Sequence, residues 1–124
     1  MPATAAQVLG ARAEQLALEY LQARGLTIVE RNYRRRLGEI DLVALDHGVL
    51  VIAEVRTRSS DAFGGAAASV DGRKQRRIIR AAEQLLQRHR DYAALPVRFD
   101  VLIVTAAATD APAVLHWLRH AFEA

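Results

Sequence analysis

The sequence predicts an α/β protein, in which helices flank a mixed sheet made of an antiparallel hairpin and a parallel strand. Residues 38–58 alternate with period two on both sides of a short polar break, which is typical of a hairpin. Residues 96–104 form a nearly continuous apolar run, typical of a strand covered on both faces. A helical pattern lies between these two segments, so we expect a right-handed crossover and parallel pairing of the strands it joins.

Length and composition limit the class of protein. The 124 residues are enough for one domain with a single core, and the hydrophobic content of 52% excludes a disordered chain. The absence of cysteine excludes a disulfide framework and a thiolate metal site, which fits a cytoplasmic location. We see no signal-peptide pattern and no apolar run of about 18 residues, so we expect no membrane association.

Positive charge is concentrated in the middle of the chain. The net charge is +3, yet residues 31–90 contain 13 basic and 7 acidic residues. All but one of the basic residues are arginine, whose planar guanidinium group pairs well with phosphate, although an Ala- and Arg-rich chain can also reflect genome composition. The location of the charge therefore favours a nucleic-acid partner more than the choice of arginine does.

The first predicted helix covers residues 5–24 and ends at Gly25. Its apolar stripe consists of Leu9, Ala13, Leu16, Ala17, Tyr20 and Leu21. Glu14 lies at the edge of this stripe, where it can point across the sheet toward Asp41. The alternative is a solvated glutamate that pairs with a neighbour such as Arg12.

Residues 26–33 form the next predicted strand, which leads into three consecutive arginines, Arg34, Arg35 and Arg36. Three guanidinium groups beside an acidic site would bind phosphate, whereas the alternative is a solubilising loop.

The turn of the hairpin fixes its register. If His47 and Gly48 form a two-residue turn, Asp46 pairs with Val49, because histidine tolerates a positive φ better than most residues and glycine accepts it freely. A shift of one residue would send facing side chains to opposite faces of the sheet.

This register places Asp41 directly across from Glu54, and Glu39 across from Arg56, with Cβ atoms about 5 Å apart. Two carboxylates this close on an apolar surface repel each other, and a divalent cation such as Mg²⁺ removes the repulsion by binding both. The alternative is a set of cross-strand ion pairs on a solvated face, and the spacing alone does not decide between the two.

A loop over residues 59–68 is expected to precede a second helix over residues 71–89, which Asp71 caps. Four arginines follow the spacing i, i+3, i+4, i+7 along one exposed face: Arg73, Arg76, Arg77 and Arg80. Lys74, the only lysine, lies instead in line with the apolar stripe and is expected to lean toward the sheet. A basic helical face is also common as a simple solvated surface. After the strand at 96–104, residues 114–118 predict a short strand and residues 120–123 a helical end.

Several motifs occur in one order along the chain. They are Gly10 and Glu14 with Tyr20-Leu21, then Gly25 and Asn32, Gly38-Glu39-Ile40-Asp41-Leu42, Glu54-Val55-Arg56-Thr57-Arg58, Phe63-Gly64, Lys74, Arg98-Phe99-Asp100-Val101, and finally His116 and Ala121-Phe122. Over nearly the whole chain, this order resembles the YraN family of uncharacterised bacterial proteins. That family is in turn similar to the restriction-endonuclease-like PD-(D/E)xK nucleases, especially the archaeal Holliday junction resolvases.

The nuclease pattern of a helical Glu, an Asp and a Glu-x-Lys motif falls on Glu14, Asp41 and Glu54, with Arg56 in place of the lysine. The resemblance implies one restriction-endonuclease-like domain over residues 1–124, with Mg²⁺ or Mn²⁺ held by Asp41, Glu54 and Glu14. It also implies that Arg56, or Lys74 from the helix, orients the attacking water. Arginine stays protonated and cannot accept a proton, so its presence puts the activity in doubt.

The resemblance therefore implies a metal-dependent endonuclease-like phosphodiesterase that acts on branched or structured nucleic acid, DNA rather than RNA. The residues expected to bind nucleic acid are Arg34, Arg35, Arg36, Arg58, Arg73, Arg76, Arg77 and Arg80. One alternative is a nucleic-acid-binding module without catalysis, and a weaker one is an adaptor whose arginine helix meets an acidic protein. A homodimer remains open.

Overall fold

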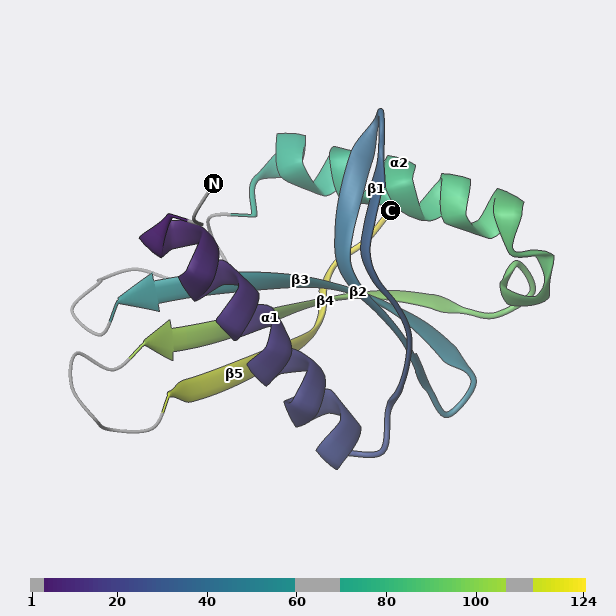
Figure 1. Ribbon diagram of the computed structural model, residues 1–124. Coiled ribbons are helices and arrows are strands. Elements are labelled where there is room, and N and C mark those ends of the chain that lie inside the picture. Colours follow the sequence, from purple (N-terminus) through teal and green to yellow (C-terminus); the bar gives the residue numbers. More distant parts are fainter. Residues whose placement is uncertain (1–3, 60–69, 107–112) are drawn as a thin grey trace.

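In the part of the chain that the structure describes, five strands form one mixed sheet, and two α-helices pack against it (Figure 1). The computed structural model describes residues 4–59, 70–106 and 113–124. In chain order the elements are α1 (Ala5–Ala23), β1 (Thr27–Arg35), β2 (Gly38–Asp46), β3 (Val49–Ser59), α2 (Gly72–Arg88), the short 3-10 helix η2 (Arg90–Tyr92), β4 (Val97–Ala106) and β5 (Val114–Phe122). The predicted α/β class is confirmed.

The sheet has the strand order β1-β2-β3-β4-β5. Its neighbours pair antiparallel except β3 and β4, which pair parallel through the crossover that contains α2. The predicted hairpin register is also confirmed, since Asp46 pairs with Val49. His47 and Gly48 adopt φ angles of 49° and 84°, the left-handed values that a two-residue turn between twisted strands requires.

The helices cover opposite faces of the sheet. Leu50 and Ile52 of β3 belong to the core on the α2 side, whereas the intervening Val51 and the following Ala53 belong to the core on the α1 side. All four side chains are at most 1% exposed, so β3 is buried on both faces, as expected for the central strand of a two-sided sheet.

The strand β2 bends at Asp41. Ile40 and Leu42 are two residues apart and would share a face of a regular strand, yet they pack into different cores. The register pairs between β2 and β3 run from the turn to Leu42 and Ala53. Beyond that point the β1–β2 ribbon turns away from the sheet and runs beside α2 (Figure 1). The bend opens a space between the ends of β2 and β3.

A glycine allows the ribbon to lie against α2. Gly38 is buried, and a Cβ atom at this position would overlap the backbone carbonyl group of Arg77. The tip of the ribbon is therefore seated directly on the backbone of the helix, which only a residue without a side chain permits.

Both helices end close to the predicted residues. The carboxylate of Asp71 accepts a hydrogen bond from the Lys74 backbone N–H at 2.9 Å, which caps α2 as expected. Gly25, with a φ of 90°, follows α1, and Leu26 N donates to the Leu21 carbonyl group at 3.1 Å. The predicted stripe of α1 is wrong at Leu9, whose side chain is exposed.

The predicted helical end at residues 120–123 is wrong, because β5 continues to Phe122. Asp100 of β4 is fully buried at a register shift between β4 and β5. Its carboxylate accepts hydrogen bonds from the side chains of Arg98 and Trp117 and from the backbone N–H of His120, at 2.8 to 3.2 Å. These hydrogen bonds hold β5 against β4 on both sides of the register shift, so the edge strand continues past it.

Two further boundaries differ from the expectation. β1 continues through Arg34 and Arg35, because both residues pair with the start of β2. The predicted loop at residues 59–68 lies outside the described residues, except for Ser59 at the end of β3. Within the described parts of the chain, neither helix has the length and apolar character needed to cross a bilayer.

Candidate functional site

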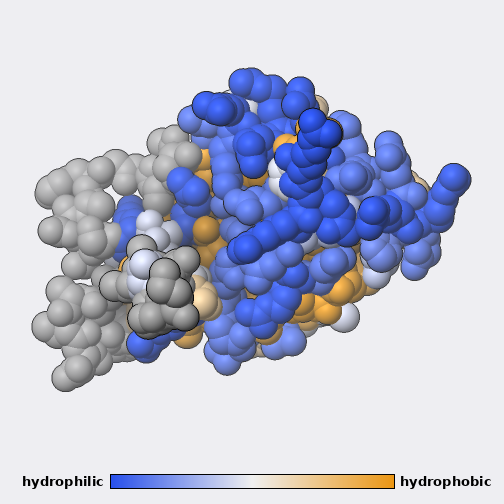
Figure 2. Space-filling view, turned by 45° about the horizontal axis from the view of Figure 1, so that its top comes forward, coloured by the Kyte–Doolittle hydropathy of each residue, from blue (hydrophilic) through white to orange (hydrophobic). Residues whose placement is uncertain are grey.

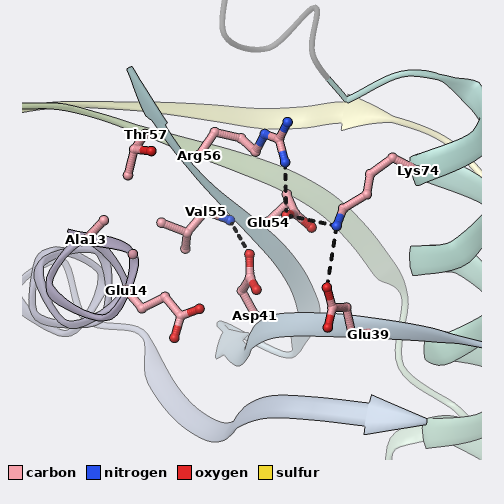
Figure 3. Close-up of a pocket in the computed structure, with 10 residues that line it drawn as sticks. Ala13, Glu14, Glu39, Asp41, Glu54, Val55, Arg56, Thr57 and Lys74 are labelled. Carbon is pink, nitrogen blue, oxygen red and sulfur yellow. Dashed lines mark hydrogen bonds and ion pairs between the residues drawn. The ribbon is translucent and has the colours of Figure 1, made fainter. Parts of the chain in front are cut away.

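A pocket of about 400 Å³ lies where β2 and β3 separate, between the N-terminal half of α1 and the start of α2 (Figure 3). Its walls come from α1, the β2–β3 hairpin and α2, so three segments distant in sequence converge on it. The residues that line it are Gly10, Ala13, Glu14, Glu39, Asp41, Glu54, Val55, Arg56, Thr57 and Lys74. All five residues predicted to be catalytic, Glu14, Asp41, Glu54, Arg56 and Lys74, are among them.

The side chain of Asp41 links β2 to β3 at the bend, where the backbone pairs between the two strands have ended. Its Oδ2 atom accepts a hydrogen bond of 2.8 Å from the backbone N–H of Val55, one residue beyond Glu54 (Figure 3). The bond ties the bent end of β2 to β3 and holds the Asp41 carboxylate beside that of Glu54. The sequence predicted these two acids to face each other, and the structure brings them together in this way.

Glu54 is the most buried ionisable group of the pocket. Its side chain is 4% exposed, and its buried Oε2 atom has no hydrogen-bond partner. Burial raises the pKa of Glu54 to about 8, and the negative charge of Asp41 acts in the same direction, while Lys74 and Arg56 oppose both. The fold therefore disfavours the negatively charged form of Glu54 relative to a glutamate in water.

Two cations approach the same oxygen of Glu54. Lys74 Nζ lies 3.7 Å from Glu54 Oε1, and Arg56 Nη1 lies 3.8 Å from it. Lys74 leans inward from α2, as the helical spacing predicted, and its Nζ atom is also 3.6 Å from Oε1 of Glu39 (Figure 3). The register between β2 and β3 ends before Glu39 and Arg56 would face each other, and Glu39 also forms an ion pair with Arg34 at 3.7 Å.

Glu14 enters the pocket from the α1 side (Figure 3). Burial, and then the charge of Asp41, raise the pKa of Glu14, while a hydrogen bond with Asn32 opposes the shift. The two carboxyl groups of Glu14 and Asp41 therefore interact electrostatically across the pocket. Among the residues that the structure describes, however, no three His, Cys, Asp or Glu side chains form a group suited to hold a metal ion. The structure thus brings Glu14 into the pocket but does not gather it with Asp41 and Glu54 into one cluster.

The predicted nucleic-acid-binding arginines divide into two sets. Arg36, Arg73, Arg76, Arg77 and Arg80 are exposed and line a second pocket of about 270 Å³ together with Leu37. Figure 2 shows a mainly hydrophilic surface over this part of the molecule. Arg34, Arg35 and Arg58 do not line this second pocket. Arg35 packs over the ring of Tyr33, with its Cζ atom 4.2 Å from the ring centroid, and the Nε atom of Arg58 is buried without a hydrogen-bond partner.

Sequence reasoning missed Leu37 and the role of Asn32. Leu37 is a 54% exposed leucine at the tip of the β1–β2 ribbon, and its position between Arg36 and Gly38 was the available signal. Asn32 has a φ of 54°, a conformation that asparagine adopts more readily than most residues, and this places its side chain near Glu14.

Comparison with known proteins gives one consistent result. Residues 13–104 match the model of "Uncharacterised protein family UPF0102", a range that contains nearly all the lining residues of the first pocket. A UPF0102 protein of Stutzerimonas stutzeri is 48% identical over 117 residues, which cover 94% of this chain and 96% of the relative. A UPF0102 protein of Xanthomonas euvesicatoria is 49% identical over 124 residues, which cover 100% of this chain and 98% of the relative. A UPF0102 protein of Pseudomonas putida strain GB-1 is 46% identical over 123 residues, which cover 99% of both chains. The names of these relatives state no activity.

Proposed function

The chain belongs to the uncharacterised protein family UPF0102, and because that name assigns no activity, we propose from the site itself that the protein is a metal-dependent nucleic-acid phosphodiesterase of the endonuclease type. Branched or structured DNA is the proposed substrate. One observation supports the proposal most strongly. Glu54 is a buried carboxylate with an unpartnered oxygen, held next to Asp41 in a pocket that also presents two cations.

The donor atoms of the pocket fit a divalent cation of the Mg²⁺ type. Such ions prefer oxygen ligands and bind to proteins through one or two carboxylates while they keep several waters, so Asp41 and Glu54 would be sufficient to hold one. The unpartnered Oε2 atom of Glu54 is the group that most needs a cation, and Glu14 adds negative charge to the same pocket. When bound, the ion would supply Lewis acidity to the scissile phosphate and lower the pKa of a coordinated water.

Lys74 and Arg56 supply the positive charge that the developing phosphorane requires. Arg56 lies beside Glu54 and can donate to phosphate oxygens, but it cannot accept a proton. Lys74 reaches the same oxygen of Glu54 from α2, and a compact ammonium group can approach an attacking water more closely than a guanidinium group. We assign Lys74 to the water and Arg56 to the phosphate.

The order of acidic residues supports a relationship to the PD-(D/E)xK nucleases. An acid on the first helix, an aspartate at a bend of one strand and a glutamate on the next strand converge here as Glu14, Asp41 and Glu54. The departure is Arg56 at the lysine position. In this chain the ammonium group comes from Lys74 on α2 and reaches the same glutamate.

A second candidate is a nucleic-acid-binding module without catalysis. Two observations favour it: Glu14 is not gathered with Asp41 and Glu54 into a three-ligand group among the described residues, and arginine occupies the position of the usual lysine. The basic surface of α2 would serve this function equally well.

A cleavage assay separates the two candidates. Linear, flapped, forked and four-way DNA and a structured RNA are incubated with the protein in EDTA, Mg²⁺ or Mn²⁺. The proposal predicts metal-dependent cleavage of at least one DNA substrate by the natural protein. Asp41→Asn should abolish this cleavage, whereas Glu83→Gln, which neutralises an exposed acid on α2, should retain it. Cleavage that is equal in EDTA, or equal in Asp41→Asn, would contradict the proposal. Binding without any cleavage would support the second candidate.

A further inference from the structure

A basic pocket lies on the other side of α2 from Lys74, between the helix and the tip of the β1–β2 ribbon. Its volume is about 270 Å³, and it is lined by Arg36, Leu37, Arg73, Arg76, Arg77 and Arg80. The ribbon is fixed against the helix at Gly38, where a side chain would overlap the Arg77 backbone, so the two walls of the pocket are held in place without a ligand.

The described residues do not compensate the positive charge of this pocket. Among the described residues, no acidic side chain lines it and none of its five arginines forms an ion pair. Guanidinium groups this close repel one another, and their planar donors match phosphate oxygens well. The pocket is therefore suited to an anion with several oxygen atoms.

Leu37 is the one apolar residue among the described residues that line the pocket. It is 54% exposed at the tip of the ribbon, between the Arg36 and Gly38 positions. An exposed leucine beside a cluster of arginines contributes nothing to the binding of a free anion, because its side chain has no hydrogen-bond donor. It suits a ligand in which a phosphate is attached to an apolar group, and proteins that open nucleic-acid stacks insert leucine and similar side chains between bases.

The basic pocket and the pocket lined by Glu14, Asp41 and Glu54, which we call the acidic pocket, share the helix α2 as a wall. The first two turns of α2 present Lys74 to the acidic pocket and Arg73 and Arg77 to the basic pocket. A nucleic-acid backbone that crosses these turns can therefore contact both pockets.

We propose that the basic pocket binds a backbone phosphate near the acidic pocket while Leu37 contacts an unstacked base beside that phosphate. The protein thereby selects nucleic acid that contains an unpaired stretch or an interruption in one strand. This inference rests on the proposed function for the meaning of the acidic pocket, but binding can be measured without cleavage.

The first test removes charge from the pocket. Fluorescence anisotropy in EDTA measures the affinity for a DNA duplex that carries a short single-stranded gap. Arg76→Gln/Arg80→Gln is compared with Arg88→Gln/Arg90→Gln, which removes the same charge from exposed positions at the end of α2 and the start of η2. The pocket variant should lower affinity roughly tenfold and reduce the slope of log affinity against log salt by about 1 to 2, while the control should lose less than about threefold. Equal losses in the two variants would overturn the proposal.

The second test removes the apolar side chain. The natural protein should bind the gapped duplex about fivefold more tightly than an intact duplex of the same length, and Leu37→Ala should reduce this ratio to less than about twofold. Leu118→Ala, at an exposed leucine on β5, is the matched control and should keep the ratio. An unchanged ratio in Leu37→Ala would overturn the base contact, and tight binding of pyrophosphate at equal ionic strength with no binding of either DNA would show a free-anion site instead.

These outcomes are independent of the cleavage assay. If the gapped duplex binds through the basic pocket and no substrate is cleaved, the hydrolytic function fails while this inference holds. If cleavage occurs and the pocket variant behaves as its control, the inference fails while the hydrolytic function holds.

Discussion

Among individual residues, Glu54 has the environment on which the candidate site depends most: it is buried beside Asp41 and lies near two cations. Its position on β3 could be predicted from the alternation of the hairpin, as could its closeness to Asp41. Its burial could not, because alternation shows only which face a residue takes and not what covers that face. Lys74 of α2 contributes to the cover, and burial changes an ordinary surface acid into one whose pKa is raised to about 8.

We predict that this shift makes stability depend on pH in metal-free buffer. The pKa of Glu54 is higher in the folded protein than the ordinary 4.5, so between about pH 4.5 and 8 the native state binds more protons than the unfolded state. The free energy of unfolding should therefore fall as the pH rises through this range, by a few kcal/mol at about 1.4 kcal/mol per unit of pKa shift.

Urea unfolding in EDTA at several pH values measures this dependence. Glu54→Gln should flatten the profile and be more stable than the natural protein at pH 8, while Glu83→Gln should keep the natural profile. A natural profile that rises between pH 5 and 8 by the same amount in all three proteins would show that Glu54 is not held neutral.

The two cations beside Glu54 should be separable by mutation. We predict that Arg56→Lys preserves or raises metal-dependent cleavage, because a lysine can approach the water and can release a proton. Lys74→Ala should lower the rate by about 100-fold or more if Lys74 orients or deprotonates the water. The rate is measured in single turnover on the best DNA substrate. Loss of activity in Arg56→Lys together with an unchanged rate in Lys74→Ala would reverse the roles assigned to these residues.

Among the elements, β2 and α2 decide where the site lies. The helix, its Asp71 cap and the inward direction of Lys74 follow from spacing in the sequence, and the structure agrees with each. The bend of β2 at Asp41 was not predicted, because a bend depends on how the β1–β2 ribbon packs against a helix that is distant in sequence. β5 shows the same limit, since Asp100 in a neighbouring strand holds the segment that was expected to be helical.

The contact between the ribbon and α2 gives a prediction for Gly38. Gly38→Ala should destabilise the protein by about 1 to 3 kcal/mol or more, because the new Cβ atom meets the Arg77 backbone and forces the two elements apart. The same change should weaken binding of the gapped duplex, since the basic pocket lies at this contact. Gly10→Ala is the control for stability, because no atom lies within 4 Å of a Cβ at that helical position. Chemical denaturation of the two variants measures the change in stability, and fluorescence anisotropy measures the change in binding. Equal stabilities would show that the ribbon is not fixed by this contact.

At the scale of the whole molecule, the topology could be predicted from the sequence, whereas the meeting of the site residues in one pocket could be predicted only in part. Period-two alternation, an apolar strand and a capped helix predict the hairpin and the parallel crossover. The meeting of Glu14, Asp41, Glu54 and Lys74 in one pocket depends on the packing of both helices against the sheet. The basic pocket depends on it further, because Arg36 and Leu37 meet the α2 arginines only after the ribbon has turned away from the sheet.

The most direct test of the central claim is the binding of Mn²⁺ to the metal-free protein at pH 8, measured by isothermal titration calorimetry. If Asp41 and Glu54 hold the cation, the natural protein binds one ion per chain, Asp41→Asn weakens that binding roughly tenfold or more, and Glu83→Gln binds like the natural protein. Binding that is equally strong in Asp41→Asn, or absent from the natural protein, would contradict the claim that these two carboxylates form a metal site.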